Sequence, residues 1–313
     1  MSTKATMSAS PGFSGIWSAM PTPLNADGSV DADSVPRLID HHLRLGVSGL
    51  FLCGTAGEGP WLSDANRLRL IESVVRAAGK RLFISAQVTD NSSQRMIANV
   101  QAFAALGIDM PVIAPPFFCV NATQAFLEKT YHDVIEASPL PVGLYNRGKH
   151  SAVYLEPATF VRIARHPKVT IVKDSSGSDE FAQCLLALRR ELAPRLSLFC
   201  GDEFACDRYI AMGYDGLLLG GACFNGRIAG DIFALAREGK PAEAAELQRR
   251  MNAMNYTAFG GEKIPCWLAG QKHLMVKLGV LANGATLLNY ETTPECRQAI
   301  DELVEREKQY LLP

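Results

Sequence analysis

The sequence has no surplus of charge of either sign. Lys and Arg together number 31, Asp and Glu number 32, and the formal net charge at pH 7 is −1. Without a basic field to attract a phosphate backbone, nucleic acid is not an expected partner. Hydrophobic residues make up 48% of the chain and charged residues 20%, which is a globular composition and excludes a disordered or fibrous protein.

Paired cysteines and long apolar runs are also missing. The eight cysteines are scattered with no CxxC pair, so the sequence predicts neither a zinc site nor a disulfide framework and favours a reducing compartment. The N-terminus has no continuous apolar segment of the kind that a secretory signal needs. The longest uncharged stretches, residues 5–26 and 110–127, each contain three prolines, which disfavours a membrane span. We therefore expect a soluble, cytoplasmic protein.

Short apolar runs recur along the chain, and each is followed by a stretch with helical spacing. The runs are almost continuously apolar rather than alternating, which is typical of parallel strands covered on both faces. There are eight, at residues 15–24, 49–55, 82–88, 110–116, 141–146, 169–175, 196–202 and 216–221. Two stripes illustrate the helices between them: Leu62, Leu68, Ile71 and Val75, near the start signals Ser63 and Asp64, and Phe181, Leu185, Leu188 and Leu192.

Eight strand–helix units in about 225 residues predict an α/β fold, a (β/α)8 TIM barrel. An open doubly wound sheet is the alternative, and it ranks second because GTAGEG at 54–59 lacks the glycine order of GxGxxG. Further helices are expected at 227–238, 241–258, 264–280 and 294–311, more than the eighth unit needs. No linker precedes them, so we expect a flexible tail (1–11), the barrel (12–235) and a C-terminal helical extension of the same domain (236–313).

Lys173 is the most unusual residue at a predicted strand end, where barrel enzymes place their catalytic groups. It follows the apolar residues VTIV directly, so barrel walls would partly desolvate it. Desolvation disfavours the ammonium and frees an amine that can attack a carbonyl carbon. The alternative is a lysine that extends to water or pairs with Asp174.

Two other strand ends carry candidate groups. Tyr145 lies one strand–helix unit before Lys173, so its phenol could reach the same mouth and move protons, although a loop-capping tyrosine is the simpler interpretation. Thr55, Ala56 and Gly57 follow the second run. Glycines free the backbone there, so successive N–H groups could form a nest for a carboxylate, but small residues favour any tight turn.

Three motifs together resemble the dihydrodipicolinate synthase/N-acetylneuraminate lyase family: GTAGE at 54–58, YN at 145–146 and KDSSG at 173–177. The similarity extends from about residue 12 to 311. It implies a class I, Schiff-base aldolase on a (β/α)8 barrel with a helical extension, typically a homotetramer, that uses no metal or organic cofactor. By this resemblance Lys173 forms an imine with pyruvate or another 2-keto acid, Tyr145 is the proton shuttle, and Thr55 with the Ala56 N–H holds the keto-acid carboxylate. The expected substrate-binding residues are Ala56, Gly57, Arg147, His150 and Leu218.

The sequence departs from this pattern in four places, one at the keto-acid carboxylate and the others toward the second substrate. Ala56 replaces a hydroxyl residue, and Phe117-Phe118 stand where the resembling enzymes carry tyrosine. Arg147 replaces the proline that usually follows Tyr-Asn, and His150 occupies the position of an arginine that grips an aldehyde's carboxylate. The Tyr-Asn-Arg sequence and the missing tyrosine look more like the branch that acts on 2-keto-3-deoxy sugar acids, although those enzymes usually keep a threonine where this chain has Ala56.

Three functions therefore remain open. The first is a lyase that cleaves or dehydrates a 2-keto-3-deoxy sugar acid, and the second is a dihydrodipicolinate synthase that condenses pyruvate with aspartate semialdehyde. The third is a catalytically silent keto-acid-binding barrel, which retaining both Lys173 and Tyr145 disfavours. A metal-dependent aldolase is disfavoured too, because His41-His42 fall in a predicted helix. The acidic residues Glu58, Asp174, Asp202 and Glu203 are expected to be helix caps and loop pairs.

Overall fold

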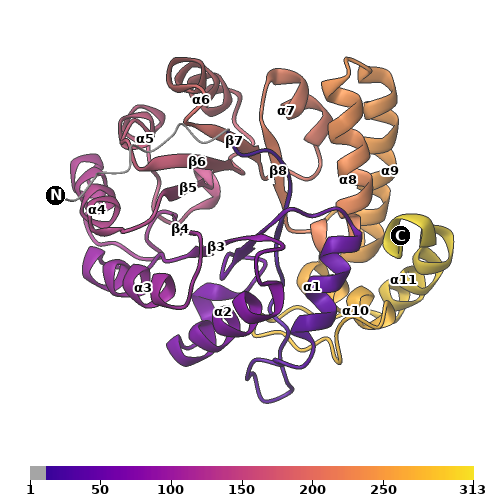
Figure 1. Cartoon of the computed structure of the whole chain (residues 1–313). Coiled ribbons are helices and arrows are strands. Elements are labelled where there is room, and N and C mark those ends of the chain that lie inside the picture. The colour runs from indigo at the N-terminus through magenta and orange to yellow at the C-terminus, as the bar shows by residue number, and fades with distance from the viewer. Residues whose placement is uncertain (1–11) are drawn as a thin grey trace.

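Eight parallel strands close into a barrel in a computed structural model that describes residues 12–313 (Figure 1). Each strand pairs with its neighbours in chain order, and β1 pairs with β8 to close the ring. The strands are β1 (Gly15–Ala19), β2 (Gly49–Leu52), β3 (Phe83–Gln87), β4 (Met110–Ile113), β5 (Val142–Asn146), β6 (Val169–Asp174), β7 (Ser197–Cys200) and β8 (Gly216–Leu219). The barrel prediction is confirmed, and so is each predicted strand, although β1, β2, β4, β7 and β8 end before the prolines and glycines of their apolar runs.

A helix follows every strand and lies outside the ring, as Figure 1 shows. These helices are α1 (Val35–Arg44), α2 (Asp64–Ala78), α3 (Ser93–Ala105), α4 (Gln124–Ala137), α5 (Pro157–Ala164), α6 (Asp179–Leu192), α7 (Cys206–Met212) and α8 (Ala222–Arg237). The strands are therefore apolar on both faces. One face packs against the helices and the other fills the barrel, where Trp17, Phe51 and Phe199 belong to an inner cluster.

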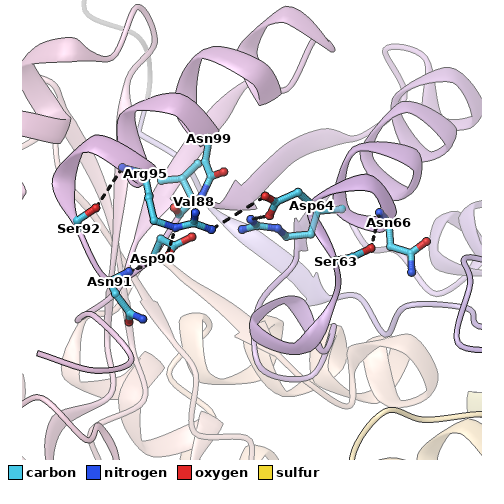
Figure 2. A network of polar contacts seen from close by, with 10 residues as sticks. Ser63, Asp64, Asn66, Val88, Asp90, Asn91, Ser92, Arg95 and Asn99 are labelled. Carbon is cyan, nitrogen blue, oxygen red and sulfur yellow. Dashed lines mark hydrogen bonds and ion pairs between the residues drawn. The ribbon is translucent and has the colours of Figure 1, made fainter.

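The helix starts at the carboxyl ends of β2 and β3 are capped by serines (Figure 2). Ser63 accepts the N–H of Asn66 at 3.2 Å, and Ser92 accepts the N–H of Arg95 at 3.4 Å. The predicted stripe on α2 is wrong in part: Leu68 is exposed, and the buried face instead carries Arg67, Leu70, Ile71 and Val74. Ile71 is buried as predicted, whereas Leu68 lies one residue past the buried Arg67, whose aliphatic stem does not count as apolar in a sequence pattern.

The C-terminal extension packs against the side of the barrel formed by α7 and α8 (Figure 1). It consists of α9 (Pro241–Phe259), α10 (Trp267–Lys277), α11 (Pro294–Arg306) and α12 (Lys308–Leu311). Helix α8 begins five residues before its predicted start, because small residues let it pack closely: a Cβ on Gly226 would lie 3.1 Å from Val47. The predicted tail at 1–11 lies outside the described residues. Within 12–313, no helix combines the length and apolarity that a membrane crossing requires.

Candidate active site

Lys173 lies at the carboxyl end of β6 with only 5% of its surface exposed. Its Nζ is 4.5 Å from the ring centroid of Tyr145 and 5.0 Å from that of Phe51. Burial lowers the pKa of this ammonium below the ordinary value of 10.5, although Tyr145 and Glu203 oppose the shift. The side chain does not extend to water. It is held between two aromatic rings, which favours a reactive amine.

Asp174 does not serve as the counter-ion of its neighbour. Its carboxylate accepts hydrogen bonds from Asn146 Nδ2 at 2.9 Å, the Ser176 N–H at 3.1 Å and the Tyr214 hydroxyl at 2.8 Å. Burial raises the pKa of Asp174 against these donors. The Asp174 carboxylate therefore fixes the ends of β5 and β6 against each other and does not form an ion pair with Lys173.

Tyr145 is the register partner of Lys173 in the sheet, on the adjacent strand β5. Its ring meets the Phe51 ring edge-on, with centroids 5.8 Å apart. Burial raises the pKa of the phenol, but the positive charges of Lys173 and Arg147 and the nearby hydroxyls of Ser175 and Thr55 outweigh it and leave that pKa below 10.0. A phenol in this position is suited to exchange protons with a group bound to Lys173.

The loop after β2 presents unpaired backbone donors. Among residues 12–313, no backbone carbonyl accepts the N–H groups of Thr55, Ala56 or Gly57. The loop is tightly constrained: Cys53 and Glu58 have φ values of 57° and 56°, and a Cβ on Gly57 would lie 2.9 Å from the Met20 carbonyl oxygen. Successive free N–H groups in such a turn form a nest that fits a carboxylate.

A cavity of about 340 Å³ opens beside this loop at the barrel mouth. Its lining includes no acidic side chain; the residues are Thr55, Pro60, Trp61, Gln87, Asn91, Ala114, Pro115, Pro116, Phe117, Arg147, Ser151 and Ala152. Gln87 is 4% exposed, and its Oε1, like the Ser151 Oγ, is buried without a hydrogen-bond partner among residues 12–313. Buried polar atoms of this kind are uncommon and indicate a place where a polar ligand binds.

The structure brings together some predicted site residues and separates others. Thr55 and Arg147 line the cavity, whereas His150 lies in an exposed 3₁₀ turn (Gly148–His150). Phe118 is 67% exposed at the rim, where Asn91 accepts its N–H at 3.0 Å. Leu218, a predicted substrate contact, is 2% exposed and belongs to the same inner cluster as Ala56 and Tyr145.

Sequence reasoning missed Phe51, Gln87 and Ser151 as site residues. Strand periodicity could have found the first two, since Phe51 and Gln87 belong to the inward-facing sets of β2 and β3. Glu203 accepts the Gly221 N–H at 2.7 Å, and burial raises its pKa to about 7. The described residues contain no group of three or more His, Cys, Asp or Glu side chains placed to bind a metal ion.

A parallel barrel that buries a lysine against a tyrosine at its mouth is the arrangement of a Schiff-base, pyruvate-dependent type of lyase. The chain belongs to the dihydrodipicolinate synthetase family, whose model matches residues 12–298. It is 34% identical over 207 residues to the 4-hydroxy-tetrahydrodipicolinate synthase of Stenotrophomonas maltophilia strain K279a. The aligned residues cover 66% of this chain and 68% of the relative.

Solved structures agree with this assignment. A dihydrodipicolinate synthase from Bacteroides thetaiotaomicron superposes with a TM-score of 0.84 and 28% identity, covering 95% of this chain and 99% of that one. CdNal from Clostridium difficile, solved in complex with mannosamine, gives a TM-score of 0.85 over 94% of this chain and 98% of the other. At 21% identity the second comparison shows a shared fold.

Proposed function

We propose that this protein is a class I lyase that forms an imine between Lys173 and the keto carbon of pyruvate or a pyruvyl compound. The observation that carries the proposal is the buried amine of Lys173 between the rings of Tyr145 and Phe51. In imine formation the amine adds to the keto carbon, the keto oxygen leaves as water, and the resulting iminium draws electrons from the adjacent carbon. No bound metal is required for this step.

The remaining roles follow from position. The N–H groups of Ala56 and Gly57, with the Thr55 hydroxyl, would hold the substrate carboxylate, since they have no backbone acceptor among residues 12–313. Tyr145, with its lowered pKa, would take a proton from the carbon next to the iminium and return it later. Ala56 supplies a backbone donor only.

For the complete reaction we favour the synthase chemistry: the enamine carbon attacks the aldehyde of aspartate semialdehyde, and the aldehyde oxygen takes up a proton. The amino group of the semialdehyde then adds to the iminium carbon, which closes the ring and expels the Lys173 amine. The sequence alone favours a sugar-acid lyase. The relatives at 34% identity, which are named as 4-hydroxy-tetrahydrodipicolinate synthases, instead support the synthase. The family assignment across residues 12–298 supports the same ranking.

A lyase for a 2-keto-3-deoxy sugar acid is the second candidate, and the mouth cavity favours it. Gln87 and Ser151 offer buried, unpartnered oxygens there that suit substrate hydroxyls. The cavity lining has no carboxylate to pair with the ammonium of aspartate semialdehyde. Phe118 has no hydroxyl with which to extend a proton relay.

Comparing kcat/KM for two reactions tests the assignment. Pyruvate with aspartate semialdehyde is measured against a panel of 2-keto-3-deoxy sugar acids under the same conditions. Synthase efficiency at or above the best sugar-acid value supports the synthase. A sugar-acid efficiency at least about 100-fold higher, the scale of one well-placed acid–base group, assigns the second candidate.

We further propose a cytoplasmic homo-oligomer, with a tetramer as the family expectation. All eight cysteines lie within 12–313 and are free thiols, which favours a reducing compartment. Exposed Phe118, Val120 and Phe126 form apolar surface after β4 that a second copy could cover. A related structure is described as a monomeric dihydrodipicolinate synthase variant, so light scattering on the purified protein is the deciding measurement.

A further inference from the structure

A fully buried ion pair joins the C-terminal extension to the loop after β2. Lys272 on α10 contacts the carboxylate of Glu58, and the two side chains are 1% and 0% exposed. The pair is separated by 214 residues in the chain. No other ion pair in the described part of the chain has both partners this deeply buried.

Both partners of the pair have further hydrogen bonds. Glu58 Oε2 accepts the Thr286 hydroxyl at 2.8 Å and the Leu287 N–H at 2.5 Å, while Lys272 Nζ donates to the Ala285 carbonyl at 2.6 Å. Segment 285–287 and helix α10 therefore hold one carboxylate from several directions. A buried pair with completed hydrogen bonds is specific in geometry, because any displacement leaves a charge unpaired.

The carboxylate is held directly beside the proposed nest. Glu58 follows Gly57, and its own φ of 56° lies in the left-handed region, as does that of Cys53 at the other end of the loop. Non-glycine residues keep this conformation only where surrounding contacts enforce it. On the Glu58 side, backbone hydrogen bonds within the loop, such as that from the Glu58 N–H to the Thr55 carbonyl at 3.1 Å, hold the turn. The C-terminal extension adds the contacts that fix the Glu58 side chain.

We propose that Lys272 and Glu58 are positioning residues, through which the C-terminal extension sets the geometry of the nest that holds the keto-acid carboxylate. The inference rests on the proposed function of the nest. It gives the extension a role in substrate recognition beyond covering the barrel. Neither side chain touches the reacting atoms.

The test compares two electrophiles that differ only in the group the nest would bind. Imine formation at Lys173 is trapped with borohydride, using pyruvate and, separately, its neutral ester methyl pyruvate, at concentrations below saturation. The ratio of the two trapping rates reports recognition of the carboxylate. A loss of stability alone would slow both rates together and leave this ratio unchanged.

Lys272→Met should lower the pyruvate preference about tenfold or more, the order expected for losing a hydrogen bond to a charged group. Thr286→Val keeps both charges and should lower the pyruvate preference about threefold, so it tests the proposal even if Lys272→Met does not fold. Thr286→Ser keeps the hydroxyl and should keep the wild-type ratio. Arg250→Met is the matched control. It breaks the Arg250–Glu307 pair, whose shortest distance is 2.8 Å, within the same extension, and should leave the ratio unchanged.

Two failures are distinguishable. If the wild-type protein gives no pyruvate adduct on Lys173, the proposed function is wrong and this inference falls with it. The positioning role alone is overturned if the wild-type protein prefers pyruvate and both Lys272→Met and Thr286→Val keep that preference. If Lys272→Met does not fold, an unchanged preference in Thr286→Val is sufficient. A lower ratio in Arg250→Met equal to that in Lys272→Met would also overturn it.

Discussion

The two halves of the barrel mouth differ in how many of their polar groups are already paired. Around β5 and β6, Asp174 accepts hydrogen bonds from Asn146, Ser176 and Tyr214, and the rings of Tyr145 and Phe51 enclose Lys173. The exception in this half is the buried Ser175 Oγ, which has no partner among residues 12–313. Around β3 and the segment after β5, the oxygens of Gln87 and Ser151 are buried beside a cavity and have no partner in the part of the chain that the structure describes. The paired half can fix the reacting groups in advance, while the unpaired half gains its hydrogen bonds from the substrate.

Removing the amine from the paired half should have the largest effect. Lys173→Met keeps a similar chain length and apolar stem but has no nucleophile, so turnover should fall about 10³-fold or more. The measurement is steady-state kcat with the best substrate of the panel. Retention of a tenth of the wild-type kcat would remove Lys173 from the chemistry.

The position of a residue in the chain decides whether its place in the site could be predicted from the sequence. Lys173 and Tyr145 could be placed from sequence because each ends an apolar strand, and the ends of parallel strands share one face of a barrel. The Lys272–Glu58 contact could not, since it joins residues 214 positions apart through the packing of α10. The orphan oxygen of Gln87 also depends on three-dimensional neighbours that spacing does not supply.

The phenol in the same half should matter next. Tyr145→Phe preserves the ring beside Lys173 but removes the proton donor, so kcat should fall about 10²-fold. The KM for pyruvate should change little, because the carboxylate nest is untouched. A normal kcat combined with a raised KM would instead make Tyr145 a binding residue.

In the unpaired half, loss of one polar group should change selectivity rather than chemistry. Gln87→Met should lower kcat/KM for the full substrate about tenfold or more, the usual cost of losing a buried hydrogen bond, and leave the half-saturating pyruvate concentration for imine trapping unchanged. Ser85→Ala is the control: Ser85 lies two residues earlier on β3, and its hydroxyl already donates to the Leu50 carbonyl at 2.8 Å. Equal losses in both variants would argue for a general effect on β3.

The pH at which imine formation reaches its full rate should be lower than for an ordinary lysine. The amine of Lys173 reacts only when neutral, and burial lowers its pKa, so the trapping rate should rise with pH and level off below 10.5. Rapid-quench trapping over a pH series gives the profile. A rate that continues to rise up to the value of an ordinary lysine would show that the enclosure by Phe51 and Tyr145 does not activate the amine.

Removal of divalent metal ions by a chelator should leave the turnover rate unchanged. In the proposed mechanism, the iminium of Lys173 accepts the electrons that a metal-dependent aldolase passes to its ion. Turnover after dialysis against EDTA should equal that of the untreated protein. Lost activity that zinc or magnesium restores would contradict a class I mechanism.

The most direct test of the central claim is mass mapping of the trapped imine. The wild-type protein is incubated with pyruvate, reduced with borohydride, digested and analysed by mass spectrometry, with Lys272→Met treated in parallel at saturating pyruvate. The account predicts one pyruvyl adduct, on the peptide that contains Lys173, in both proteins. An adduct on a different lysine, or none in the wild-type protein, would contradict it.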